Sequence, residues 1–146
     1  MGPGPAGVIE LAELEVNVLE FLHKSFSFAR LVPWREQELA VFQRTETENE
    51  AKFRPKIVHL LLVVPREWVL YDLAADVLVL GSDGRTPGPR PAGTAVESAA
   101  ESHEFREQGI DFRRVDVGGR LVYVPKTWAA ELTGAAGRSA LGLDES

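Results

Sequence analysis

The sequence predicts an α+β fold with an N-terminal helix, a mixed or antiparallel sheet that includes a C-terminal β-hairpin, and a short C-terminal helix. Three observations support this prediction. Apolar residues repeat at helical spacing from Val8 to about Lys24, uninterrupted apolar runs lie near the middle of the chain, and alternating runs flank Gly118-Gly119. Because 146 residues is a common size for one domain, we expect 1–146 to form a single domain.

The predicted N-terminal helix follows a Pro- and Gly-rich segment, residues 1–7, which we expect to be a flexible arm. The apolar positions of the helix are Leu11, Leu14, Val18 and Phe21 or Leu22. A strand is the alternative, because apolar and polar residues also alternate over 13–18. Leu19 breaks that alternation, so the pattern favours the helix.

Buried strands are predicted in the middle of the chain. The apolar run Ile57–Val64 is the strongest strand pattern, and Val77–Leu80 is the second. Two neighbouring strands without charges are typical of the middle of a sheet. Residues 39–45 predict a further strand that leads into a polar turn at 46–50, and residues 67–74 fit either a short helix or a bent strand.

The second half begins with a Pro/Gly-rich segment, residues 81–95, which predicts a surface loop. Two capping-box patterns then predict a polar helix within 95–108. The alternating runs on both sides of Gly118-Gly119 predict a hairpin, because glycine tolerates the positive φ of a tight turn.

After the hairpin, Pro125 introduces the predicted short C-terminal helix, whose Trp128 and Leu132 should face the core. Residues 134–146 form a tail of small residues with an acidic end. No internal repeat is found in the sequence.

Composition excludes several classes of protein. The chain has no Cys, which removes disulfides, thiolate chemistry and cysteine metal sites, and its net charge of −6 with 45% hydrophobic residues is ordinary for a globular protein. No apolar run reaches the ~20 residues of a membrane span, and no basic leader is present, so we expect a cytoplasmic protein. The excess of Arg over Lys and the scarcity of Asn, Gln and Met indicate a bacterial protein, from either a GC-rich or a thermophilic source.

No catalytic or cofactor motif is recognisable. The histidines are His23, His59 and His103, and none has a second histidine at metal-ligand spacing. His59 lies within the apolar run, where a hydrogen-bonded core histidine is the ordinary interpretation and an acid or base in a pocket is the alternative. Residues 81–84 match neither a phosphate loop, a dinucleotide fingerprint nor a nucleophile elbow. The sequence therefore predicts no catalytic residue, no metal and no cofactor.

A local basic stripe is the first candidate site. Lys52, Arg54 and Lys56 alternate with other residues, so they can share one face of a strand, and Arg113 and Arg114 can extend the stripe from the hairpin. Such a stripe is typical of nucleic-acid or phosphate binding. The alternative is a solvated sheet edge, and the pI near 5.1 argues against a nucleic-acid-binding domain.

An aromatic segment is the second candidate site, for a protein partner. It contains Phe26, Phe28 and Trp34, which we expect to be exposed. The first functional hypothesis is therefore a non-enzymatic interaction module, a subunit, adaptor or regulatory protein that binds another protein or a second copy of itself. Binding of nucleic acid or a phosphorylated ligand through the basic stripe is the alternative, and an enzyme with an unrecognised site is the third hypothesis.

Overall fold

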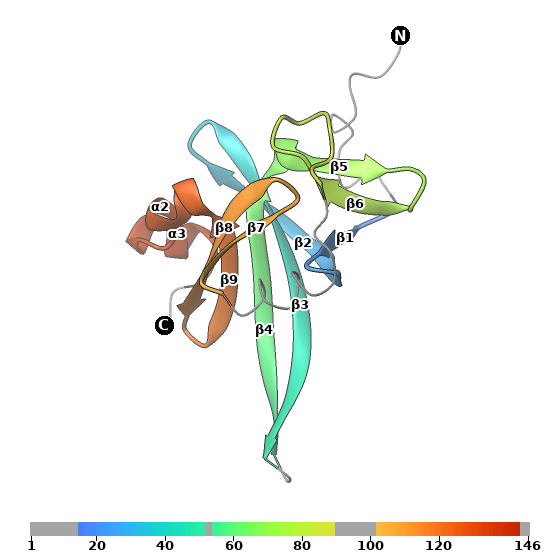
Figure 1. Ribbon diagram of the computed structural model, residues 1–146. Helices are drawn as coiled ribbons and strands as arrows, with labels where there is room; N and C mark the ends of the chain where they lie inside the picture. The colour runs from blue at the N-terminus through green and yellow to red at the C-terminus, as the bar shows by residue number, and fades with distance from the viewer. Residues whose placement is uncertain (1–14, 52–53, 90–101, 144–146) are drawn as a thin grey trace.

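The computed structural model describes residues 15–51, 54–89 and 102–143, and this part of the chain is mostly β-structure (Figure 1). Its strands are β1 (Val18–Phe21), β2 (Lys24–Trp34), β3 (Gln37–Ala51), β4 (Arg54–Pro65), β5 (Val69–Asp72), β6 (Val77–Leu80), β7 (Glu104–Glu107), β8 (Ile110–Val117) and β9 (Arg120–Pro125). Its helices are the 3₁₀ turns η2 (Arg66–Trp68) and η3 (Lys126–Trp128) and the α-helices α2 (Ala129–Leu132) and α3 (Ala135–Ala140).

The nine strands form one sheet in the order β5-β6-β1-β2-β3-β4-β9-β8-β7. The pairs β1–β6 and β4–β9 are parallel, and the other neighbours are antiparallel. The predicted α+β class is therefore wrong, because the helices are short and a mixed sheet carries almost the whole fold.

The predicted N-terminal helix is wrong for residues 15–24, and residues 8–14 lie outside the described part. β1 and β2 form a hairpin whose turn is Leu22-His23, with φ values of 54° and 57°. Positive φ at both positions defines a type I′ turn, which normally contains Asn, Asp or Gly. The sequence Leu22-His23 therefore gives no local indication of this turn. Because Leu19, Phe21 and Leu22 are all buried, their spacing also resembles the apolar face of a helix.

The polar helix predicted within 95–108 is also wrong where the structure describes it, since residues 104–107 form β7, paired with β8. Residues 95–101 lie outside the described part. Phe105 is the only apolar residue of β7, and it stacks on Phe112 with ring centroids 5.8 Å apart. One apolar side chain between charged neighbours is sufficient for a short strand with one face inward.

The hairpin predicted at Gly118-Gly119 is confirmed: β8 and β9 pair antiparallel, and the two glycines have φ values of 59° and 82°. The runs Ile57–Val64 and Val77–Leu80 are strands, as predicted. The polar turn predicted at 46–50 is wrong, because β3 continues through it to Ala51. The short C-terminal helix is present as η3 and α2.

The sheet curls until its two ends meet. Phe21 of β1 contacts Phe112 of β8 and Phe105 of β7, with ring centroids 5.0 and 6.1 Å apart, although these strands are distant in the sheet order. The face inside the curl, here called the inner face, buries one core that also contains Phe26, Phe42, Leu60, Leu62, Leu78, Leu80 and Tyr123.

The β7–β8 turn closes the curl with side-chain hydrogen bonds. Leu22 N donates to Glu107 Oε2 at 3.0 Å, and Leu80 N donates to Gln108 Oε1 at 2.8 Å. Gln108 Nε2 donates in turn to Glu20 O at 2.9 Å. Both turn side chains are buried. They satisfy backbone groups of β1, of the β1–β2 turn and of β6, at a place where no β-ladder among the described residues joins the two ends of the sheet.

The outer face of the sheet carries a second core. Val32, Val41, Val63 and Val122 lie under a cover made by the C-terminal segment, from which Leu132, Leu141 and Leu143 are buried. The tail expected at 134–146 thus contributes α3 and two anchoring leucines. Figure 1 shows α2 and α3 over one end of the sheet, while the β3–β4 hairpin extends far beyond the other strands. The remainder of the outer face is therefore not covered by these helices.

The chain also contains a repeat that the sequence analysis missed. β4 ends in Pro65 followed by η2, and β9 ends in Pro125 followed by η3, so both strands carry the pattern Pro-x-x-Trp. The two prolines have the same conformation, with φ −57° and ψ 138° or 137°. β4 and β9 lie side by side and parallel, each with its hairpin partner on the far side. The β3–β4 and β8–β9 hairpins thus meet through a parallel strand pair, and β4 and β9 end in the same local turn.

Candidate functional site

The three aromatic residues predicted to bind a partner do not form one exposed segment. Phe26 is completely buried in the inner core, where its ring lies edge-on to Phe21 at 5.7 Å. Phe28 packs on Phe42 at 5.6 Å, also on the inner face. Trp34 packs on the outer core, because a bulge between Phe28 and Arg30 shifts the alternation of β2. Exposure of Phe26 is therefore excluded.

The predicted basic stripe is divided in the structure. Lys52 lies outside the described residues, and Arg54 and Lys56 lie on β4 with Ala51 and Glu48 as their Cα partners on β3. Lys56 thus faces an acidic residue of the neighbouring strand, and Arg54 faces an alanine. Successive strand residues point to opposite faces, so the neighbours Arg113 and Arg114 cannot both join one stripe.

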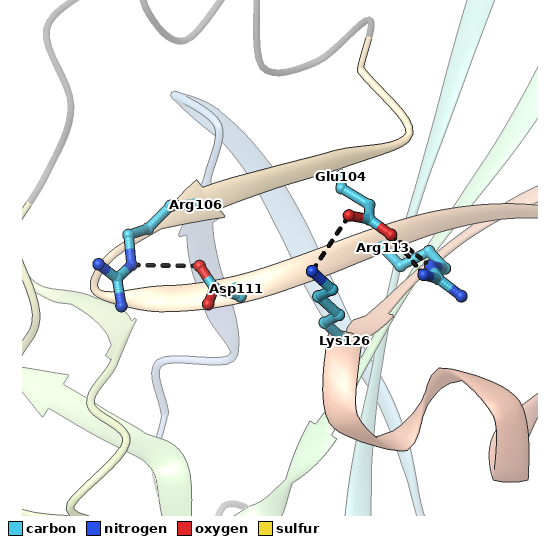
Figure 2. Close-up of polar contacts among 5 residues, drawn as sticks. All are labelled: Glu104, Arg106, Asp111, Arg113 and Lys126. Atoms are coloured by element: carbon cyan, nitrogen blue, oxygen red, sulfur yellow. Dashed lines mark hydrogen bonds and ion pairs between the residues drawn. The ribbon is translucent and has the colours of Figure 1, made fainter.

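Arg113 also takes part in an ion-pair cluster on the β7–β8 hairpin, which is drawn in Figure 2. Its Nε donates to Glu104 Oε2 at 3.1 Å, and Lys126 Nζ reaches Glu104 Oε1 at 3.2 Å. Arg106 pairs with Asp111 at 3.3 Å on the same hairpin. The hydrogen bonds from Arg113 and Lys126 lower the pKa of Glu104 below its ordinary value of 4.5.

This cluster should make stability depend on pH in acid. A carboxylate whose pKa is lower in the folded protein contributes stability above its unfolded pKa, and that stability disappears as the pH falls through the folded pKa. We expect Glu104→Gln to flatten the fall of unfolding free energy between about pH 5 and pH 3, measured by urea unfolding. If the variant and the unmodified protein lose stability in parallel, Glu104 does not contribute to acid sensitivity.

A different group of basic residues meets on the outer face. A hollow of about 450 Å³ opens there, over β2, β3, β4 and β9 and beside the C-terminal segment. We call it the arginine pocket, because Arg30, Arg120 and His59 line it. Arg44 also borders the hollow, but it lies between the outer-face positions Gln43 and Thr45 on β3, so its side chain points to the inner face. No Asp or Glu of the described residues lines it.

Strand register explains how the pocket forms. Thr45, His59 and Arg120 are consecutive Cα partners across β3, β4 and β9, so their side chains point to the same face. Two residues further along each strand, the outer-face positions are Gln43, Leu61 and Val122; Leu61 and Val122 pack in the outer core, and Gln43 is still exposed. The outer face therefore changes from apolar to polar where the cover of α2 and α3 ends.

Two arginines of the pocket also hold its wall. Arg30 Nη2 donates to Leu141 O, and Arg120 Nη1 donates to Gly142 O at 3.3 Å. Leu141 and Leu143, on either side of this glycine, are anchored in the outer core. Each guanidinium has five N–H groups, so both retain donors for a ligand.

The charges on the two faces of the sheet are compensated differently. On the inner face, Arg44 donates to Glu46 Oε2 at 2.8 Å and to Ser25 O at 2.9 Å. Burial raises the pKa of Glu46, but hydrogen bonds from Lys24 and Arg44 outweigh it, and the pKa is lowered overall. Within the part of the chain that the structure describes, neither Arg30 nor Arg120 has a carboxylate partner. The pocket is thus a locally positive site on an acidic protein.

Sequence reasoning recognised only one residue of this site, His59, as an alternative to a core histidine. It missed Arg30 and Arg120, which belong to two other strands. A weak pattern was present: Gln43 and Thr45 continue the alternation of β3 with polar residues, and this indicates an outer face that is no longer buried.

No protein-family model matches this chain, and no curated protein or solved structure is significantly similar to it. The described residues contain no group of three or more His, Cys, Asp or Glu side chains placed to hold a metal ion. They also contain no helix long and apolar enough to cross a membrane. The functional argument therefore depends on the arginine pocket itself.

Proposed function

We propose that the protein binds a small anionic ligand of the phosphate class in the arginine pocket. The observation that carries the proposal is the convergence of Arg30, Arg120 and His59 on a hollow that no described carboxylate lines. Guanidinium groups bind phosphate oxygens with charge-assisted and often bidentate hydrogen bonds, which are stronger than neutral ones. The volume of about 450 Å³ suits a small molecule.

A small ligand fits the charge distribution better than a nucleic acid. Long polyanions need an extended basic surface, and the hairpin beyond the pocket carries its acidic strand opposite its basic strand. A small phosphate is affected mainly by the charges around the pocket. Of the second hypothesis, binding of nucleic acid or a phosphorylated ligand, the phosphorylated ligand is therefore retained. The residues that would bind it differ from the predicted basic stripe. The interaction-module hypothesis stays a prediction, without Phe26.

The proposal is tested by calorimetric titration of inorganic phosphate into the protein and into single variants. Arg120→Ala should weaken binding about tenfold to a hundredfold, since a hydrogen bond to a charged group contributes ~1.5–3 kcal/mol. The phosphate affinity of Arg120→Lys should lie between those of the unmodified protein and Arg120→Ala, because lysine keeps the charge and loses the planar guanidinium fork. Affinity should also fall as salt rises.

Arg106→Ala is the matched control. Arg106 is also an arginine on a strand, its side chain is 70% exposed, and it lies outside the pocket. Its loss should leave phosphate affinity within about twofold of the original. Thermal melting of each variant confirms that it folds. Equal affinities of the Arg120 and Arg106 variants, or no phosphate binding by the unmodified protein, would refute the proposed function.

A further inference from the structure

A second hollow of about 440 Å³ adjoins the arginine pocket on the outer face. The two hollows share four lining residues, Gln43, Arg44, Thr45 and His59. The second hollow adds Ser25 and Ser27 from β2, and every described residue that lines it is polar. We call it the hydroxyl pocket.

The side chains of the hydroxyl pocket are available to a ligand. Ser25, Ser27, Gln43 and Thr45 are exposed, and their side chains form no hydrogen bond with any other described residue. Hydroxyl and amide groups both donate and accept hydrogen bonds. A ligand that also carries donors and acceptors on neighbouring atoms, as vicinal hydroxyls do, matches this set best.

Resting on the proposed function, we infer that the ligand is a phosphorylated polyol, such as a sugar phosphate. Its phosphate lies at Arg30, Arg120 and His59 in the arginine pocket. Its hydroxyls lie along the hydroxyl pocket, where they meet Ser27, Gln43 and Thr45. Because the two hollows share lining residues, they are close enough for one small molecule to occupy both.

A nucleotide fits the two hollows less well. Proteins commonly hold a base by stacking it on an aromatic side chain. Among the described residues, no Phe, Tyr or Trp lines either hollow. The half-buried Trp34 and Trp128 line a separate hollow, together with Arg35 and Glu131.

Calorimetry with four probes tests this inference: glucose 6-phosphate, inorganic phosphate, glucose and adenosine monophosphate. Glucose 6-phosphate should bind about tenfold more tightly than inorganic phosphate, because it adds hydrogen bonds in the hydroxyl pocket. Glucose alone should show no binding, and adenosine monophosphate should bind no more tightly than inorganic phosphate. Tighter binding of the nucleotide than of the sugar phosphate would overturn the inference.

Single substitutions distinguish the contributions of the two hollows to ligand affinity. Ser27→Ala and Ser25→Ala, at two residues that line only the hydroxyl pocket, should each weaken glucose 6-phosphate binding about threefold to tenfold and leave the affinity for inorganic phosphate unchanged. Thr47→Ala is the matched control, because Thr47 is exposed two residues beyond Thr45 on the same strand and lines neither hollow. It should change neither affinity.

The two proposals fail in different ways. If no phosphate compound binds, the proposed function itself is refuted. If inorganic phosphate binds through Arg120 but the sugar adds no affinity and the Ser25 and Ser27 variants behave like the control, only the polyol inference is refuted. Vesicles of phosphatidylcholine with phosphatidylinositol 4-phosphate identify the source of the polyol phosphate. Competition between the vesicles and glucose 6-phosphate assigns it to a lipid headgroup, and no vesicle binding assigns it to a free metabolite.

Discussion

Replacing Gln108 by methionine should lower the free energy of unfolding by about 2–4 kcal/mol, because buried backbone groups then lose their partners. Methionine has nearly the shape of glutamine but can neither accept from Leu80 N nor donate to Glu20 O, bonds of 2.8 and 2.9 Å in the structure. A third contact, from Gln108 Nε2 to Glu107 Oε2 at 3.2 Å, is lost as well. These bonds hold the two ends of the curled sheet together.

Urea unfolding followed by circular dichroism measures this effect. Gln37→Met is the control, since Gln37 is exposed on β3 and takes no part in the closure. That substitution should change the midpoint by little. A Gln108 variant as stable as the control would mean that aromatic packing at Phe21 closes the curl without the turn.

Gly88→Ala should also be strongly destabilising, by about 3 kcal/mol or more, because the site has no room for a methyl group. A Cβ there would lie 1.8 Å from the carbonyl oxygen of Gln108 and 2.3 Å from its carbonyl carbon, so backbone must move. Gly88 N also donates to Leu80 O at 3.0 Å, which fixes its position against β6. Its φ lies outside the left-handed region, so the effect is steric.

Gly134→Ala is the matched control for this substitution. A Cβ at Gly134 would meet its nearest atoms at 3.4 and 3.5 Å, which is ordinary contact. Removing a glycine at such a position reduces the entropy of the unfolded chain and commonly adds about 0.4–1 kcal/mol. Thermal melting should therefore shift down for the Gly88 variant and stay level or rise for the Gly134 variant. Equal melting temperatures would contradict the packing of Gly88 against the closing turn.

Local sequence patterns predicted those parts of the fold that local forces determine. The hairpin at Gly118-Gly119 was predictable because glycine relieves a specific backbone cost. The run Ile57–Val64 was predictable because a strand that ends deep in the core, with Leu62, Val63 and Val64 all buried, carries apolar residues on both faces there. The β1–β2 hairpin could not be predicted from local sequence patterns. Its Leu22-His23 turn lacks the usual residues, and a hydrogen bond from Leu22 to Glu107, 85 positions away, accompanies it.

The candidate site was beyond local patterns for a similar reason. His59 and Arg120 become neighbours only through the parallel pairing of β4 with β9. The local sequence of neither strand indicates that it pairs with the other. Arg30 reaches the same hollow because the bulge in β2 turns it to the outer face. The stripe of Lys52, Arg54 and Lys56 had the more obvious pattern. Its Cα partners on the acidic strand could be recognised only from the register of the hairpin.

The parallel pairs have a consequence for how quickly the chain reaches its folded state. Leu60 pairs with Leu121 and Leu19 with Leu78, so each parallel ladder must bring together segments that are distant in sequence. Loop closure of this kind costs chain entropy before any contact compensates for it, and folding rates fall as such contacts come to dominate. The hairpins should form early and the two parallel ladders late. During that interval the apolar strand β4 is exposed along one edge, and newly made protein is then most prone to aggregate.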